Sequence, residues 1–342
     1  KKNINGSTYY FNQEGVMQTG WTFIDGHWNY FANSGAMQTG WIKVQDTWYY
    51  LDKDGIMLTG KQEINSTRYY LNASGAMQTG WKWLENNWYY YANSGAMKTG
   101  WIKDNEKWYY LNQDGIMQTG KQEINGSRYY LNTSGAMQTG WQWLDKHWHY
   151  YADSGAMKTG WLKDQGTWYY LEDQEGIMLV GFQQVDGKQY YFSASGAMQT
   201  GWKWFDNHYR YFEANGAMKT GWIKDKGIWY YLNPEDGIML VGLHKVNGDH
   251  YYFDESGAMQ IGWKRIDGNW YYFQTDGSLL KNATTPDGYK VNEEGIWRQA
   301  VAAVNGEADQ SEKKQEASSS IAEQPKQDSN LEANTSDKKE KE

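Results

Sequence analysis

The chain repeats itself every 20 residues, and this period limits the possible folds more than any other feature of the sequence. The segment Ala-Met-Gln-Thr-Gly-Trp, for example, begins at Ala36, Ala76 and Ala136. Fixed periods of this kind are typical of repeat proteins, in which each unit packs on its neighbours. Two repeats hold one extra residue, before Gly176 and Gly237, and we expect a loop there. The fourteen repeats begin at residues 1, 21, 41, 61, 81, 101, 121, 141, 161, 182, 202, 222, 243 and 263.

Each repeat has the pattern of a β-hairpin. In the repeat at 21, two aromatic-rich segments flank Asp25-Gly26, a strong short-range signal for a two-residue hairpin turn. With that turn, Trp21 lies opposite Tyr30. Phe23 lies opposite Trp28, and the two-residue period of a strand puts all four side chains on one face. Because a lone hairpin is marginal in water, each one has to bury apolar surface against its neighbours.

We therefore predict an all-β fold, a solenoid or superhelix of about 14 tandem hairpins, over residues 1–280. Residues 281–299 retain a few apolar side chains, and we expect them to form a C-terminal cap. Residues 300–342 consist largely of Glu, Lys, Gln, Ser and Asp without any aromatic residue, which predicts a disordered charged linker or tail.

Composition and charge argue against several classes of function. The formal net charge of −8 disfavours nucleic acid, whose phosphates would be repelled. The sequence has no cysteine, its six histidines follow no metal-ligand spacing, and no apolar run approaches the length of a membrane span. No nucleophile elbow or phosphate-binding loop is visible, and the acidic residues gather at turns. We expect no catalysis, cofactor, metal, nucleic-acid partner or membrane span.

Tryptophan occupies positions 1 and 8 of the repeats in pairs, where position 1 is the first residue of each repeat. Nine repeats have this pair, with Tyr209 as the one replacement. Tryptophans that merely fill a core would have no reason to disappear together, so the paired loss favours a binding site over a core. The repeats without the pair have Lys1 with Thr8, Lys61 with Arg68, Lys121 with Arg128, Phe182 with Gln189 and Leu243 with His250.

A pair of tryptophans completed by a tyrosine of the next repeat suits a quaternary ammonium such as choline. This cation has no N–H to donate and is held by the faces of aromatic rings. Three rings provide a few kcal/mol, which corresponds to roughly millimolar affinity for one site. Many equivalent sites facing a polymer that carries the ligand gain orders of magnitude in avidity, which is a physical reason to repeat the hairpin.

The segment from Gly100 to Met117 closely resembles the cell-wall-binding repeats of streptococcal and pneumococcal choline-binding proteins, and the resemblance covers residues 1 to about 280. It implies a left-handed superhelix with each hairpin turned about a third of a revolution from the last. It also implies that choline or phosphocholine of teichoic or lipoteichoic acid sits between consecutive repeats with a methionine nearby. An extracellular, cell-wall-associated protein is the implied location.

The resemblance also implies which residues form the cages. They are Trp21, Trp28 and Tyr50; Trp41, Trp48 and Tyr70; Trp81, Trp88 and Tyr110; Trp101, Trp108 and Tyr130; Trp141, Trp148 and Tyr170; Trp161, Trp168 and Tyr191; Trp202, Tyr209 and Tyr231; and Trp222, Trp229 and Tyr252. Trp263 and Trp270 form a last pair without a following repeat to supply the third wall.

The repeats that lack tryptophan recur at every third position. If the superhelix turns once per three repeats, their sites stack along one side, where Lys61, Arg68, Lys121 and Arg128 would repel choline. We expect two choline-binding edges and a third edge free for another partner, such as a glycan, a host protein or a cell-wall hydrolase.

Two alternatives stay open at the level of sequence. Repeats that bind glucan or another carbohydrate also stack aromatic hairpins, although paired tryptophans favour choline. The sequence begins at Lys1 without an initiator methionine or signal peptide, so we expect a processed or excised segment, and the array is compatible with an anchoring part of a larger murein hydrolase or adhesin.

Overall fold

The structure is a computed structural model that describes residues 1–298, and all regular secondary structure in this range is β-strand. Fourteen consecutive hairpins confirm the predicted all-β repeat architecture and the repeat boundaries. The tail predicted at 300–342 and the last residue of the predicted cap lie outside the described residues. No helix within residues 1–298 is long and apolar enough to cross a membrane.

The strands pair in the order of the chain. The first seven hairpins are β1 (Lys2–Ile4) with β2 (Ser7–Tyr9), β3 (Gly20–Ile24) with β4 (His27–Phe31), β5 (Gly40–Val44) with β6 (Thr47–Leu51), β7 (Gly60–Ile64) with β8 (Thr67–Leu71), β9 (Gly80–Leu84) with β10 (Asn87–Tyr91), β11 (Gly100–Asp104) with β12 (Lys107–Leu111), and β13 (Gly120–Ile124) with β14 (Ser127–Leu131). The next seven are β15 (Gly140–Leu144) with β16 (His147–Tyr151), β17 (Gly160–Asp164) with β18 (Thr167–Leu171), β19 (Gly181–Val185) with β20 (Lys188–Phe192), β21 (Gly201–Phe205) with β22 (His208–Phe212), β23 (Gly221–Asp225) with β24 (Ile228–Leu232), β25 (Gly242–Val246) with β26 (Asp249–Phe253), and β27 (Gly262–Ile266) with β28 (Asn269–Phe273).

The hairpin turns have the predicted two-residue geometry. Ile24 pairs with His27, and the two turn residues between them, Asp25 and Gly26, have φ values of 51° and 82°. Two positive φ values match the right-handed twist of the flanking strands, which is why Asp-Gly favours this turn. Several repeats make the same turn without glycine, so the geometry is imposed by the strand register as well as by the turn residues.

The core is a column formed by one residue of each hairpin, at position 11. This residue ends the second strand and is at most 1% exposed in every repeat from the second onward. Its burial, together with the exposure of the position-8 tryptophans, shows that the core is made mainly of leucine, phenylalanine and tyrosine. The column consists of Phe31, Leu51, Leu71, Tyr91, Leu111, Leu131, Tyr151, Leu171, Phe192, Phe212, Leu232, Phe253 and Phe273.

Consecutive repeats are joined by the methionine that follows each hairpin. The backbone N–H of Met117 donates to the carbonyl of Trp88 in the preceding repeat, at 2.9 Å. The side chain of Met117 packs on Gly135 in the following repeat, whose φ is 81°. A Cβ atom at that glycine would overlap the methionine sulfur, so the backbone conformation and the close approach both require glycine there.

The chain forms two compact bodies. The repeat body comprises Lys1–Ile261 with Phe273–Leu279, and the terminal body comprises Gly262–Tyr272 with the described residues from Leu280 onward. In the terminal body, the sheet order is β27-β28-β31-β30-β29, so the short strands β29 (Ala283–Thr284), β30 (Lys290–Val291) and β31 (Ile296–Trp297) extend the last hairpin. The domain boundaries at 280 and 299 stay predictions.

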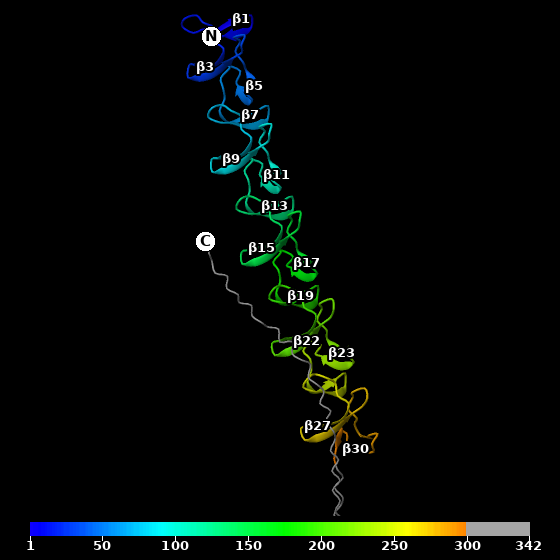
Figure 1. The fold of residues 1–342 in the computed structure, drawn as a ribbon. Coiled ribbons are helices and arrows are strands. Elements are labelled where there is room, and N and C mark those ends of the chain that lie inside the picture. Colours follow the sequence, from blue (N-terminus) through cyan, green and yellow to red (C-terminus); the bar gives the residue numbers. More distant parts are fainter. Residues whose placement is uncertain (299–342) are drawn as a thin grey trace, which may run out of the picture. The chain divides into compact units, whose positions relative to one another are not determined.

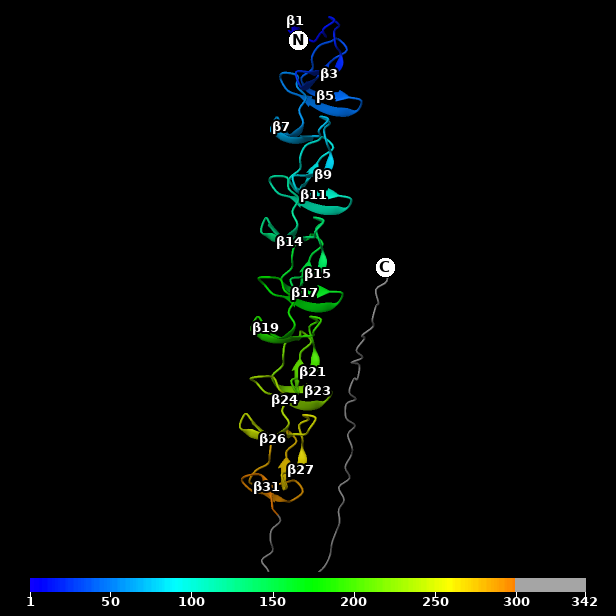
Figure 2. The ribbon, with the colours of Figure 1, turned by 90° about the vertical axis from the view of Figure 1, so that its left-hand side faces the viewer.

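Within the repeat body, hairpins three repeats apart project in the same direction. Those that begin with β3, β9 and β15 lie on one side in Figure 1, and those that begin with β5, β11 and β17 lie on the other. Figure 2 shows the same recurrence after a quarter turn. Three edges result: a degenerate edge (repeats at 1, 61, 121, 182 and 243), a tryptophan edge (21, 81, 141 and 202) and a lysine edge (41, 101, 161 and 222).

Candidate choline-binding cages

The position-1 and position-8 rings of seven repeats in the repeat body, those that begin at residues 41, 81, 101, 141, 161, 202 and 222, form a right-angled corner on the outer face of the hairpin. The ring centroids of Trp81 and Trp88 lie 6.4 Å apart, with an angle of 89° between the ring planes. The corner forms because position 1 follows the glycine that begins the first strand, and position 8 lies diagonally across the ladder. Trp88 is 40% exposed although its hairpin is well packed. A large aromatic side chain kept this open at every equivalent site is typical of a binding surface.

A tyrosine of the next repeat contacts the corner of Trp81 and Trp88, and it is the residue at position 9. Tyr109 lies 4.9 Å from the ring of Trp81, and a cavity of about 310 Å³ is lined by Trp81, Trp88, Tyr109, Met117 and Ser134. Tyr110, the position-10 residue expected there, does not line this cavity, and the assignment of the residues that contact choline stays a prediction.

The reason is the alternation of side chains along a strand. Tyr110 pairs with Trp101 across its own hairpin and packs on it at 5.1 Å. Tyr109 points to the opposite face, which packs on the preceding repeat. Position 9 therefore reaches the neighbouring cage and position 10 supports its own.

In all eight pairs of the repeat body, the tyrosine that contacts the position-1 tryptophan comes from position 9 of the next repeat, one residue before the expected position 10. The tyrosines in ring contact with the position-1 tryptophan of the preceding repeat are Tyr49, Tyr69, Tyr109, Tyr129, Tyr169, Tyr190, Tyr230 and Tyr251, in place of Tyr50, Tyr70, Tyr110, Tyr130, Tyr170, Tyr191, Tyr231 and Tyr252.

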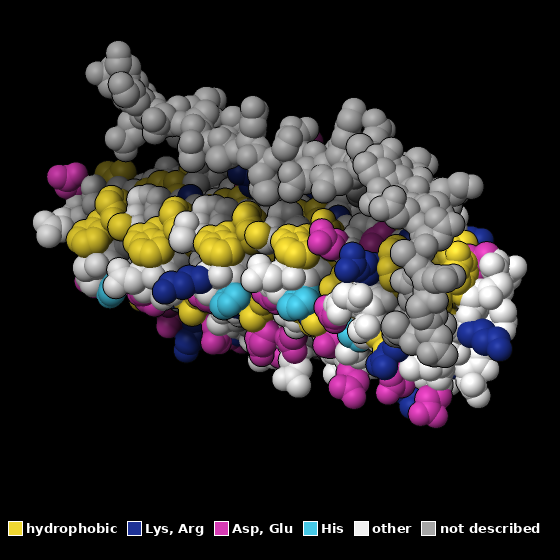
Figure 3. Space-filling view, turned by 90° about the horizontal axis from the view of Figure 1, so that it is seen from below, with side chains coloured by type: hydrophobic (Ala, Val, Ile, Leu, Met, Phe, Trp, Pro, Cys, Tyr) yellow, Lys and Arg dark blue, Asp and Glu magenta, His cyan; other side chains and the backbone are white. Residues whose placement is uncertain are grey.

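The tryptophan edge carries two features that sequence reasoning missed. The indole N–H of Trp81 donates to the carboxylate of Asp104, and the same bond joins Trp141 to Asp164. Position 3 holds an additional exposed ring, as in Trp83, which is 54% exposed and lies 5.4 Å from Trp88. The sequence contained a signal for both features, because aspartate recurs at position 4 of the following repeats and tryptophan recurs at position 3. Figure 3 shows a face along which hydrophobic side chains recur at regular intervals.

The lysine edge presents a cation at the same position. Lys163 lies opposite Trp168 in the ladder, and its Nζ atom is 5.6 Å from the centroid of a Trp168 ring. Lys224 has the same distance to Trp229. The aromatic corners of the two edges thus have the same geometry, but the charge beside the corner differs between the edges.

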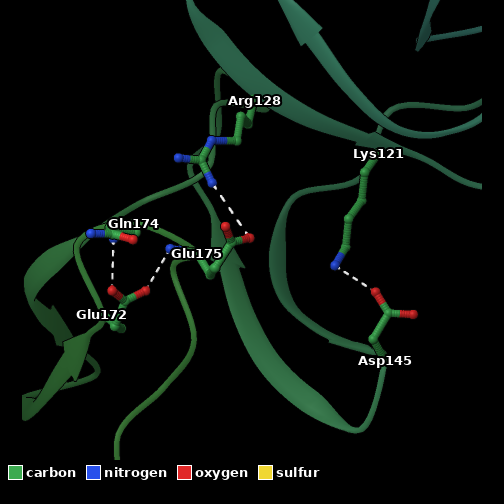
Figure 4. Close-up of polar contacts among 6 residues, drawn as sticks. All are labelled: Lys121, Arg128, Asp145, Glu172, Gln174 and Glu175. Atoms are coloured by element: carbon green, nitrogen blue, oxygen red, sulfur yellow. Dashed lines mark hydrogen bonds and ion pairs between the residues drawn. The ribbon is translucent and has the colours of Figure 1, made fainter.

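On the degenerate edge, Lys61, Arg68, Lys121 and Arg128 occupy the positions that tryptophans have on the other edges, and both lysines have acidic partners. Lys61 donates to Glu85 at 2.7 Å and to the hydroxyl of Tyr89 at 3.1 Å. Burial alone would lower the pKa of Lys61, but these two bonds outweigh it and raise the pKa. Lys121 donates to Asp145 at 2.6 Å and holds the pKa of that carboxyl below its ordinary value (Figure 4).

The last tryptophan pair lies in the terminal body. Trp263 and Trp270 form a corner of 85°, with centroids 6.5 Å apart. Tyr289 and Trp297 lie 5.8 Å and 6.4 Å from Trp263, so residues beyond the repeats provide the missing aromatic neighbours. The indole N–H of Trp263 donates to Asp287.

Comparisons with known proteins agree with this geometry. The family model for the choline-binding repeat matches the chain in nine overlapping segments that run from residue 1 to residue 283. A search of curated proteins found no match.

Solved structures provide further relatives. Choline binding protein F of Streptococcus pneumoniae, in the presence of a peptidoglycan analogue, is 32% identical, with a TM-score of 0.50 over 76% of this chain and 98% of that chain. CbpJ of the same organism is 33% identical over 86% of this chain and 98% of its own, with a TM-score of 0.31. The modular autolysin LytC from that species is 27% identical over 65% of this chain and 52% of its own, with a TM-score of 0.45. The chain belongs to the choline-binding repeat family.

Proposed function

We propose that the chain is a non-catalytic module that attaches to phosphocholine on teichoic and lipoteichoic acids of a Gram-positive cell surface. The observation that carries this proposal is the right-angled tryptophan corner, closed by Tyr109 of the next repeat in the cage of Trp81 and Trp88. Three ring faces around an open cavity suit a trimethylammonium group, because this cation has no N–H to donate and is attracted to the faces of aromatic rings.

The number of cages supports a polymeric ligand. Seven pairs of the repeat body have this right-angled corner, and they lie on two edges. The cavity around Trp81 is also lined by Met117 of the next repeat and Ser134 of the repeat after it. One cage with three rings has roughly millimolar affinity for choline. A polymer that carries choline at intervals engages several cages at once, and its retention then rises by orders of magnitude.

The proposed role needs no cofactor, and its location would be extracellular and cell-wall-associated. Among residues 1–298, no group of three His, Cys, Asp or Glu side chains is placed to hold a metal ion. The similarity to a modular autolysin supports a role as the anchoring part of a larger protein as well as an independent surface module.

The test is a choline titration of the purified chain, followed by tryptophan fluorescence and by elution from an immobilised tertiary amine. We expect saturable quenching at millimolar choline and elution by free choline. In the matched variant, leucine replaces position 8 of all eight cages, which preserves apolar bulk but removes one wall of each. That variant should lose both responses. Retention on the matrix that choline fails to elute, or unchanged quenching in the variant, would contradict the proposal.

A further inference from the structure

The degenerate edge contains two cavities at the places where the other edges have aromatic cages. One, of about 210 Å³, is lined by Lys121, Arg128 and His149 among others. The other, of about 340 Å³, is lined by the equivalent residues Lys61 and Arg68 with Tyr89. Lysine and arginine replace the two tryptophans of a cage, so the cavity persists while its chemistry changes from aromatic to polar.

The charges around the cavity at Lys121 disfavour a simple ion of either sign. A cation would meet Lys121 and Arg128, and an anion would meet Glu123 and Glu175, which line the same cavity. Arg128 and Glu175 face each other at 3.8 Å, longer than a hydrogen bond, as Figure 4 shows. Both groups therefore retain hydrogen-bonding capacity, and a ligand that donates and accepts at once fits between them.

His149 points to the kind of group that such a ligand presents. The side chain is 3% exposed and lines the cavity, and its Nδ1 atom has no hydrogen-bond partner. The other ring nitrogen bonds to the backbone of Glu175, which fixes Nδ1 as an acceptor. Carboxylate, phosphate and trimethylammonium groups have no hydrogen to donate to it, whereas a hydroxyl group has.

Position 9 of the repeat at 21, which follows the degenerate repeat at 1 as the repeat at 141 follows that at 121, has the same feature. Asn29, which is 1% exposed, donates to the carbonyl of Gly55 and leaves its Oδ1 atom without a partner. At the site of the repeat at 182, position 9 of the following repeat is Arg210, which fills the place itself. Arg210 donates to the carbonyl of Asp236 at 2.9 Å and lies 4.6 Å from the ring centroid of Phe205. Two sites of similar lining, at Lys61 and Lys121, remain open.

We propose that these two cavities bind neutral saccharide units, with sugar hydroxyls bridging Arg128, Glu175 and Nδ1 of His149, and with the ring of Tyr151 beside the apolar face of the sugar. Tyr151 lines the cavity. The planar guanidinium and carboxylate groups can hydrogen-bond to the hydroxyls of a sugar, and an aromatic ring can pack on its apolar C–H face. Because the sites recur along one edge, a polysaccharide engages both, and the array holds glycan and choline-bearing polymer on separate edges.

The experiment uses the full chain in saturating choline, so that the aromatic cages are occupied. Maltotriose, cellotriose and chitotriose are titrated by calorimetry and by saturation-transfer NMR. We expect at least one to bind two sites with a dissociation constant of about 1 mM, a typical value for a small polar site. The double variant Arg68→Leu, Arg128→Leu should weaken binding at least tenfold, and His149→Phe should remove one of the two sites. Phenylalanine fits because a tyrosine stands at the equivalent position.

Choline titration of the same variants is the control, since none of the three side chains belongs to a cage, and its midpoint should not change. The proposal is overturned if no trisaccharide binds below about 10 mM, which would leave cavities that hold only water. It is also overturned if the double variant binds as the parent does, or if acetate or tetramethylammonium competes with the sugar. Loss of choline binding in the parent chain would contradict the proposed function instead.

Discussion

The indole N–H of Trp81 donates a hydrogen bond to the carboxylate of Asp104 in the next hairpin, 3.1 Å away. The bond fixes the orientation of one cage wall and places a negative charge beside a site for a cation. Trp141 and Trp202 make the same bond to Asp164 and Asp225. The lysine edge instead has an ammonium group at position 3, so the two edges with tryptophan pairs differ in electrostatics although their aromatic corners match.

The first prediction concerns these carboxylates. The triple variant Asp104→Asn, Asp164→Asn, Asp225→Asn should weaken choline binding on the tryptophan edge about threefold at low salt, as expected for one charge several ångströms away in water. Fluorescence titration at two salt concentrations measures this. Asp52→Asn is the control, because Asp52 accepts the turn hydrogen bonds that Asn72 accepts in the next repeat. An equal loss in both variants would rule out a local effect.

The second prediction concerns the lysine edge. Replacement of Lys43, Lys103, Lys163 and Lys224 by glutamine should strengthen choline binding about twofold and weaken phosphocholine binding by a similar factor. The ammonium group repels choline itself but attracts the phosphate attached to it. Competition between the two ligands, measured in the parent and the variant, gives the ratio directly. An unchanged ratio would show that the lysines do not sense the phosphate.

The third prediction separates backbone strain from side-chain overlap. Gly126 and Gly135 have φ values of 77° and 81°, but only a Cβ atom at Gly135 would meet another side chain, the sulfur of Met117. Gly126→Ala should cost about 1 kcal/mol of unfolding free energy. Gly135→Ala should cost clearly more and should also weaken choline binding, because Met117 lines the cage of Trp81. Urea unfolding checks this, and equal costs for the two variants would refute it.

The fourth prediction concerns turns without glycine. Glu106 and Lys146 occupy the second turn position with φ values of 66° and 68°, where other repeats have glycine. Glu106→Gly and Lys146→Gly should each stabilise the fold by about 0.5 kcal/mol, the relief of left-handed strain less the added entropy of the unfolded chain. Thermal unfolding measures the gain. At Asn86, where asparagine tolerates this conformation better, the same substitution should have a smaller effect.

The fifth prediction concerns pH. Burial lowers the pKa of His149 below its ordinary value of 6.5, and the charge of Lys121 adds to this effect. The folded chain therefore binds a proton at His149 less readily than the unfolded chain, so stability falls as pH drops below about 6.5. Arg128, Glu123 and Glu175 face the same cavity, and Asp145 and His147 lie nearby on its strands and turn.

His149→Tyr removes this effect, since tyrosine occupies the equivalent position 89. Urea midpoints at pH 7.5 and 5.5 should differ more for the parent than for the variant. The carboxyl of Asp145, whose pKa is lowered by its bond from Lys121, contributes only at more acidic pH and stays the same in both chains. An identical pH dependence in the two proteins would show that His149 does not take part.

The hairpins and their turns could be predicted from the sequence, because they depend on short-range patterns. The turn at Asp25-Gly26 and the opposition of Trp21 and Tyr30 follow from two-residue alternation around a two-residue loop, and the structure has that register. The three-repeat recurrence of the degenerate sites was likewise visible as a 60-residue period.

Packing between repeats, which the sequence does not reveal, determines which tyrosine contacts Trp81. Tyr109 and Tyr110 are adjacent and chemically identical, and only the packing of one hairpin on the next determines which face meets Trp81. Two further features also depend on packing between repeats. Trp81 bonds to Asp104, which lies 23 positions along the chain, and the ring of His149 is positioned by the backbone of Glu175, which leaves its Nδ1 atom buried without a partner. Spacing within one repeat carries no information about such contacts, since they depend on the rotation and rise between hairpins.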